Sequence, residues 1–292
     1  MPILSVRHVT TYHYKRPVTF GEHRMMLRPR DDDDQKVIET EIEITPRPEQ
    51  IAWAKDSFGN HVATAHFGRR ARELRFVSRI RIDHRSRDFS ASSIANSART
   101  YPFTYAPEDR PGLECFMEPV SPHPAIDRWS AKFFDRHGSA DTHELLCEMT
   151  RTIRRTFKHV SRHEKGTQDP ASTLDLGSGS CRDLAVLMMA ALRARGIAAR
   201  FVSGYLHLAD DDDAAEGGNT HAWVQVYVPG PGWIDFDPSG GSVGNGNLVR
   251  VAVAQDPREA IPLHGTWFGT AADHLGMKVA VKVTAALTTD LS

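Results

Sequence analysis

Residues 177–196 read Gly-Ser-Gly-Ser-Cys-Arg-Asp-Leu-Ala-Val-Leu-Met-Met-Ala-Ala-Leu-Arg-Ala-Arg-Gly. The apolar residues recur at the spacing of one helix face: Leu184, Leu187, Met188, Ala191 and Leu192. Ser180 and Asp183 have the spacing of a capping box, in which the serine accepts from the Asp183 amide and the carboxylate accepts from the Ser180 amide. The pattern therefore predicts a helix with Cys181 in its first turn.

Cys181 is the candidate nucleophile. A helix N-terminus lowers the pKa of a thiol, and the unpaired amides of the first turn can donate to a developing oxyanion. The glycines on either side of Ser178 allow a substrate to approach the backbone closely. A cysteine is more often a small buried hydrophobe, and we expect Cys115 and Cys147 to be of that ordinary kind.

The strand predicted over 221–228 carries the candidate base, His221. Its even positions are all apolar, so His221 shares the other face with Trp223, Gln225 and Tyr227. The Pro-Gly-Pro-Gly turn at 229–232 then leads into a second strand with aspartates at 235 and 237. Pairing Val228 with Trp233 would put Asp237 on the wrong face, whereas pairing Tyr227 with Trp233 sets it diagonal to His221. Alternation alone leaves both aspartates open as the partner of His221.

The rest of the chain predicts an α+β protein. Residues 38–44 alternate Ile or Thr with Glu, residues 75–83 repeat this weakly, and 56–60 form a turn, so we expect an antiparallel β-sandwich over residues 1–100. Residues 101–123 read as a linker. Helices near 124–134 and 142–157 and strands near 199–205, 249–253 and 277–283 assign residues 124–292 to a catalytic domain with C-terminal strands.

Composition excludes several classes of protein. The formal net charge of -1 argues against nucleic acid as a partner, and no apolar run approaches the ~20 residues that cross a bilayer. The N-terminus lacks a basic start followed by an apolar run, and three scattered cysteines make no disulfide scaffold. We therefore expect a cytoplasmic protein that does not bind membranes.

No metal site or cofactor is predicted. The acidic runs 31–34 and 210–213 lack the spaced ligands and the glycine of a calcium-binding loop, and solvated loops account for them better. The second run and residues 217–219 lie just before His221, where we expect substrate to pass.

Several ordered motifs together resemble the bacterial transglutaminase-like family. They are Gly-Ser-Cys-Arg-Asp at 179–183, Ala-Arg-Phe-Val-Ser-Gly-Tyr at 199–205, His-Ala-Trp-Val at 221–224 and Phe-Asp-Pro at 236–238. The first half resembles the β-rich domain that precedes this core, through His8…Thr11-Tyr12-x-Tyr14, Leu27-x-Pro29-Arg30 and Asp56-x-Phe58-Gly59-Asn60. The resemblance implies a papain-like fold and a catalytic triad of Cys181 as nucleophile, His221 as base and Asp237 as orienting acid.

The expected activity is acyl transfer on the amide of a peptide or protein through a thioester on Cys181. Water as acceptor gives hydrolysis or deamidation, and an amine gives a new amide. Trp223 and Trp233 as walls of the cleft, with Ser180 beside the nucleophile, are the candidate substrate-binding residues. The alternatives are a dedicated cysteine peptidase and an inactive binding or scaffold protein that retains the fold. Edge strands of the N-terminal domain could pair two copies into a homodimer or dock a substrate protein.

Overall fold

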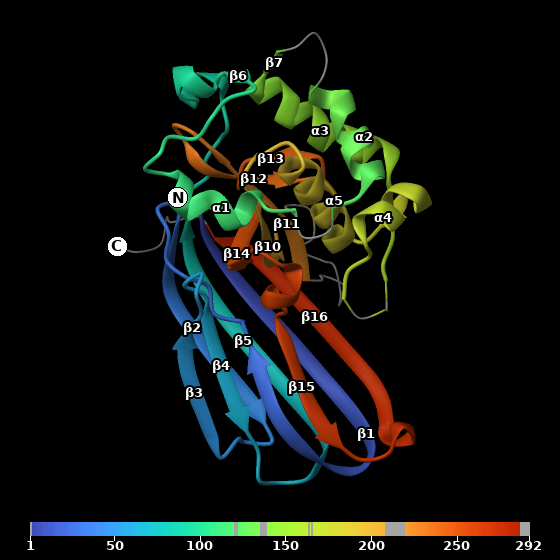
Figure 1. Cartoon of the computed structure of the whole chain (residues 1–292). Coiled ribbons are helices and arrows are strands. Elements are labelled where there is room, and N and C mark those ends of the chain that lie inside the picture. Colours follow the sequence, from blue (N-terminus) through green and yellow to red (C-terminus); the bar gives the residue numbers. More distant parts are fainter. Residues whose placement is uncertain are drawn as a thin grey trace, which may run out of the picture.

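A computed structural model describes residues 2–119, 122–134, 139–162, 164, 166–207 and 220–286. The molecule is elongated, with the helices and a short sheet at one end and a long sheet at the other (Figure 1). The long sheet holds seven strands and the short sheet five, and the pairing in both is antiparallel. The expected α+β class with an antiparallel N-terminal β domain is confirmed.

The long sheet is built on one strand that runs its full length. Its strands are β1 (Ile3–Met25), β2 (Gln35–Thr45), β3 (Gln50–Lys55), β4 (His61–His66), β5 (Ala71–His84), β15 (Leu263–Phe268) and β16 (His274–Ala286). The first half of β1 pairs with β5 and β16, and its second half pairs with β4 and β15. Residues from both halves, including Phe20, Ala63 and Phe76, share one apolar core. The two layers of the expected sandwich are therefore halves of a single curled sheet.

Both ends of the chain contribute to this long sheet. We expected the strands near the C-terminus to belong to the catalytic domain, and of these β14 (Leu248–Ala254) pairs within the short sheet. β15 and β16 instead pair with β1. Sequence patterns show that such strands alternate, but they do not show which distant strand completes their hydrogen bonds.

The short sheet carries the helices at one end of the molecule (Figure 1). Its strand order is β13-β12-β11-β10-β14, from β10 (Ala199–Leu206), β11 (Thr220–Val228), β12 (Gly232–Asp237), β13 (Ser242–Val243) and β14. The helices are α1 (Arg110–Met117), α2 (Pro124–Phe134), α3 (Thr142–Thr156), α4 (Pro170–Leu176) and α5 (Cys181–Arg193). The apolar face of α5 packs on this sheet, with Leu184 and Leu187 in one core with Phe201 and Val224. That packing fixes the N-terminus of α5 over the start of β11.

Short elements connect these parts. They are η1 (Ala91–Ser93), η2 (Asn96–Ala98), β6 (Thr100–Tyr101), β7 (Ala140–Asp141), β8 (Lys158–His159), β9 (Ser178–Gly179), η3 (Pro257–Ala260) and η4 (Ala271–Asp273). The expected linker 101–123 contains α1, whose Leu113 and Phe116 are buried. The described part of this segment is therefore packed against the helical end of the molecule.

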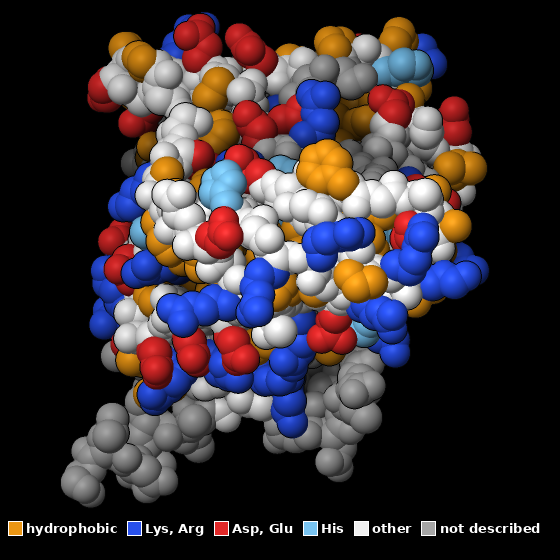
Figure 2. Space-filling model, turned by 90° about the horizontal axis from the view of Figure 1, so that it is seen from below, with side chains coloured by type: hydrophobic (Ala, Val, Ile, Leu, Met, Phe, Trp, Pro, Cys, Tyr) orange, Lys and Arg blue, Asp and Glu red, His pale blue; other side chains and the backbone are white. Residues whose placement is uncertain are grey.

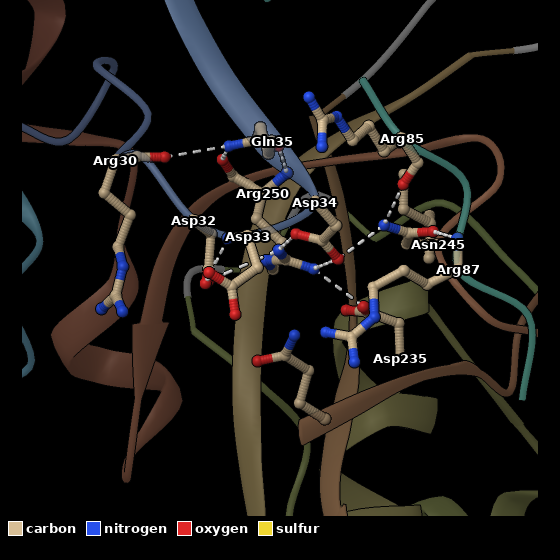
Figure 3. Close-up of polar contacts among 12 residues, drawn as sticks. Arg30, Asp32, Asp33, Asp34, Gln35, Arg85, Arg87, Asp235, Asn245 and Arg250 are labelled. Carbon is tan, nitrogen blue, oxygen red and sulfur yellow. Dashed lines mark hydrogen bonds and ion pairs between the residues drawn. The ribbon is translucent and has the colours of Figure 1, made fainter. Parts of the chain in front are cut away.

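The two sheets meet across an apolar contact and a buried cluster of charge. Leu4 and Ile80 of the long sheet share a core with Tyr205 and Val249 of the short sheet. Beside this core, Arg250 forms ion pairs with Asp34 and with Asp235, the latter at 2.9 Å (Figure 3). Of the acidic run 31–34, which we expected to be solvated, Asp34 is buried against Arg250. A carboxylate can be buried there because a guanidinium neutralises it.

The end of the molecule formed by the long sheet carries side chains of both charge signs on its surface (Figure 1 and Figure 2). Figure 2, which views this end, shows Lys and Arg side chains interspersed with Asp and Glu across the face. The long sheet also carries exposed ion pairs, such as Arg79 with Glu41, 3.1 Å apart. Over the described ranges, no helix combines the length and hydropathy needed to span a membrane.

Candidate active site

The N-terminus of α5 is fixed by a single buried carboxylate. The predicted capping box is present: the Ser180 hydroxyl and the Ser180 amide each donate to Asp183 over 2.8 Å, and the Asp183 amide donates back to the hydroxyl. Arg162 donates to both carboxylate oxygens, over 2.9 and 3.0 Å, and the Gln168 amide donates over 2.6 Å. Asp183 has no exposed surface, so these donors compensate its burial. They also hold Cys181 in the first turn of the helix.

The register of the β11–β12 hairpin places the acid beside the base. Tyr227 pairs with Trp233 and Val224 with Phe236, which is the register that sets Asp237 diagonal to His221. His221 Nε2 lies 2.8 Å from Asp237 Oδ2. Because Asp237 occupies Nε2, the other nitrogen of the ring, Nδ1, is the one that can meet the Cys181 thiol.

Asp237 is held by further donors at the end of β12. Its Oδ1 accepts from the Ser239 amide at 2.9 Å, the Ser239 hydroxyl at 2.7 Å and the Gly240 amide at 3.0 Å. Although burial raises the pKa of this carboxyl, the hydrogen bonds from His221 and Ser239 outweigh that effect and keep its pKa below the ordinary value. Asp237 is therefore ionised at neutral pH and oriented toward His221.

The electrostatics of the pair favour a thiolate and an imidazolium. Burial raises the pKa of the Cys181 thiol, but hydrogen bonds from His159 and His221, the charge of His221 and the Ala222 amide outweigh it and lower the pKa to about 6. Burial lowers the pKa of His221, but Asp237 and the Cys181 thiolate raise it to about 10. Because the thiol pKa lies below the imidazole pKa, the proton rests on His221 at neutral pH.

The structure brings Cys181, His221 and Asp237 together, and it gives the second aspartate another task. Asp235 accepts from Trp223 Nε1 at 2.6 Å and from Arg250 at 2.9 Å. These two donors, and not His221, hold the Asp235 carboxylate. The choice that alternation left open falls on Asp237.

The three candidate substrate-binding residues, Trp223, Ser180 and Trp233, are engaged in contacts within the protein. Trp223 is completely buried and stacks on the His221 ring, with centroids 6.0 Å apart, so it supports the base and offers no surface to a substrate. The Ser180 hydroxyl is engaged in the helix cap. Trp233 packs against Phe116 and under the Arg200 guanidinium, at the opposite end of β12 from Asp237. Alternation identified the shared face correctly but could not show that neighbouring segments cover it.

Sequence reasoning missed one residue at the sulfur. His159 hydrogen-bonds to the Cys181 thiol, and this contact raises the pKa of His159 above its ordinary value. It ends β8, a strand of two residues that pairs in parallel with β9. A two-residue strand has no periodicity, so no pattern in the sequence could have marked His159.

Metal ligands do not gather in the part of the chain that the structure describes, which holds no group of three or more His, Cys, Asp or Glu side chains able to bind a metal ion. The run 210–213 and residues 217–219, expected to lie along the substrate path, fall outside the described residues.

Comparison with known proteins agrees with this geometry. Residues 4–83 match the bacterial transglutaminase-like N-terminal region, and residues 134–238 match the transglutaminase-like superfamily. The chain belongs to the bacterial transglutaminase-like family. Cys181 and His221 both lie inside the matched core, and Asp237 lies at its end.

Relatives match this transglutaminase-like chain either over nearly its whole length or over a short segment. The "Uncharacterized protein ML0607" of Mycobacterium leprae is 26% identical over 282 residues, which cover 95% of this chain and 98% of the relative. A protein-glutamine gamma-glutamyltransferase of Pseudomonas aeruginosa is 39% identical over 69 residues, 22% of this chain and 10% of that protein. The crystal structure of a candidate cysteine protease from Cytophaga hutchinsonii aligns with all of this chain and 92% of its own, with a TM-score of 0.74 and 19% identity. The last similarity establishes the fold.

Proposed function

We propose that this protein is a cysteine acyltransferase that acts on an amide carbonyl of a peptide or protein substrate. The observation that carries the proposal is the chain of contacts from Asp237 through His221 to a thiol whose pKa lies near 6. A thiol that is ionised at neutral pH is a strong nucleophile, and an imidazolium beside it is the acid that a departing amine requires. The local similarity to a protein-glutamine gamma-glutamyltransferase supports the same class of reaction.

The reaction follows from the positions of these groups. The Cys181 thiolate attacks the carbonyl carbon, a C–S bond forms, and the carbonyl electron pair moves onto oxygen. The first-turn amide of Cys181 donates to that oxygen. When the intermediate collapses, the C–N bond breaks and the leaving amine takes the proton from His221, leaving a thioester. His221 then accepts a proton from the incoming water or amine, whose oxygen or nitrogen bonds to the carbonyl carbon, and the C–S bond breaks to release the Cys181 thiolate. Asp237 holds the imidazole ring in place throughout.

The acceptor decides the product. Water would hydrolyse the thioester, giving deamidation of a glutamine or cleavage of a peptide bond, and a primary amine would give a new amide. We place the reaction in the cytoplasm, because all three cysteines are free thiols and a reducing compartment keeps such a nucleophile active.

A product assay tests the proposal. The purified protein is incubated with a glutamine peptide, with and without a primary amine, and the products are identified by mass spectrometry. We expect loss of ammonia, amine incorporation or peptide cleavage in the wild-type protein and none of these in Cys181→Ala. A broad peptide set that yields no product, while Cys181 still alkylates rapidly, would favour the inactive scaffold.

A further inference from the structure

Two imidazoles, those of His159 and His221, lower the pKa of the Cys181 thiol, and the triad uses only one of them. The second, His159, is brought there by the β8–β9 bridge, in which it pairs with Gly179, two residues before the nucleophile. The Lys158 amide donates to the Gly177 carbonyl over 2.9 Å, and the Val160 amide donates to the Gly179 carbonyl over 3.0 Å. These two bonds bracket His159 and fix its backbone beside the loop that enters α5.

The two imidazoles have different surroundings. His221 is inside the protein, with 12% of its side chain exposed, and Asp237 holds one of its nitrogens. His159 is exposed, and Asp237 acts on it through its charge and not through a hydrogen bond. A carboxylate orients His221 as the base, because it stabilises the proton that the ring takes up. His159 lacks that partner and borders on solvent, where a substrate arrives.

During the reaction the negative charge moves from Sγ to a neighbouring oxygen, which a hydrogen-bond donor beside Sγ can reach. In the free protein the negative charge is on Sγ, and His159 hydrogen-bonds to that sulfur. When the thiolate attacks, the charge passes to the carbonyl oxygen next to the new C–S bond. A donor that already lies beside the sulfur can follow the charge with little movement. A hydrogen bond that strengthens as the charge arrives lowers the barrier.

We propose that His159 is a catalytic residue that donates a ring N–H to the oxyanion, together with the Cys181 amide. This assignment rests on the proposed acyl-transfer function. No proton changes hands in the step: His159 stabilises the oxyanion by hydrogen bonding, while His221 performs the proton transfers.

Two reactions of the same thiol separate this role from simple activation of the sulfur. Alkylation by iodoacetamide displaces iodide at a saturated carbon and forms no oxyanion, whereas acylation by p-nitrophenyl acetate passes through one. Both rates are measured well above the thiol pKa of each variant, so that Cys181 is fully ionised. The variants are His159→Leu, which removes the donor, His159→Gln, which keeps an N–H donor, and Lys158→Ala, an exposed neighbour in the same strand.

We expect the loss of His159 to slow acylation selectively, with much less effect on alkylation. His159→Leu lowers the acylation rate by about a hundredfold, the typical effect of removing one oxyanion donor, and changes alkylation much less. His159→Gln recovers most of the acylation, and Lys158→Ala matches the wild-type protein. Circular dichroism confirms that each variant is folded.

Three results would overturn the assignment: equal losses in both reactions, no loss in either, or a loss in Lys158→Ala as large as that in His159→Leu. If the wild-type protein is acylated and His159→Leu equals it, only the role of His159 fails. If the wild-type protein alkylates but is never acylated, the proposed function fails with it.

Discussion

Two buried clusters of charge lie along the strand β12 and differ in what their charges can do. At the end of the strand, Asp237 bonds to His221, which contacts the Cys181 thiol. Two residues earlier, Asp235 bonds to Arg250, which also binds Asp34 of the long sheet. Both clusters are shielded from solvent, because the exposed fraction of the side chain is 12% for His221 and 6% for Arg250.

The difference lies in the cation. An imidazole between a carboxylate and a thiol can give up its proton within the accessible pH range, whereas a guanidinium stays charged throughout. Although burial lowers the pKa of Arg250, Asp235 and Asp34 raise it above its ordinary value. The same residue type on one strand thus belongs to the proposed triad at position 237 and joins the two sheets at position 235.

The largest effect expected is on stability, from Arg250→Met. The substitution leaves Asp34 and Asp235 buried without their cation, which typically costs about 3–5 kcal/mol. Urea unfolding would measure this loss. The pH at which Cys181 is half alkylated in the folded variant should stay unchanged, because the cluster holds no proton of the triad. A shift of that midpoint as large as the one in Asp237→Asn would contradict the division of roles.

The next effect is on the reactivity of Cys181, from His221→Ala. With the imidazolium removed, the thiol pKa rises from about 6 toward the ordinary value of about 8.5. At pH 6 the thiolate fraction, and with it the alkylation rate, should fall by about a hundredfold. The free energy of unfolding should change far less than in Arg250→Met. Unchanged alkylation at pH 6 would remove His221 from the site.

A smaller effect is expected from Asp237→Asn, in the dependence of the Cys181 alkylation rate on pH. The thiolate and the imidazolium coexist in the pH range between the pKa of Cys181 and the pKa of His221. The Asp237 carboxylate raises the pKa of His221, so its loss lowers that pKa and moves the upper limit of this range down. Asp237 also orients the ring toward the thiol, so its loss weakens the His221 hydrogen bond that lowers the thiol pKa, and the lower limit moves up. Because one opposite charge typically shifts a pKa by roughly 1–3 units, the alkylation rate at pH 6 should fall by about tenfold. If the pH range of the thiolate–imidazolium pair widened, or shifted at one limit only, Asp237 would not be coupled to both His221 and Cys181.

The smallest effect is expected from Glu41→Gln on the exposed face of the long sheet. Glu41 and Arg79 are 59% and 44% exposed, and such pairs contribute at most about 1 kcal/mol. Urea unfolding should show a change of that size or less, and added salt should reduce it further. A loss comparable to that of Arg250→Met would mean that burial does not distinguish the two ion pairs.

Local chemistry was predictable from the sequence, because its signals are local. The capping box of Ser180 and Asp183, the helix behind Cys181 and the shared face of His221 and Trp223 follow from spacings of a few residues. These features, with the family resemblance, name Cys181 and His221 as nucleophile and base, and the structure places the two residues near each other.

Long-range pairing was not predictable from periodicity. Alternation could not fix the β11–β12 register, so it could not choose between Asp235 and Asp237. It also gave no reason for β16 to pair with β1, or for β8 to bring His159 to the thiol. Trp223 was assigned to the cleft because a pattern identifies a face without showing what covers it.

The most direct test of the central claim compares the three thiols of one sample. The protein is exposed briefly to iodoacetamide between pH 4 and pH 9, and the labelled cysteines are identified by mass spectrometry. Burial raises the pKa of Cys115 and Cys147, so we expect half-maximal labelling of Cys181 near pH 6 while the other two stay unlabelled near neutral pH. If Cys181 reacts only above about pH 8.5, as an ordinary thiol does, the Cys181–His221–Asp237 unit is not a catalytic triad.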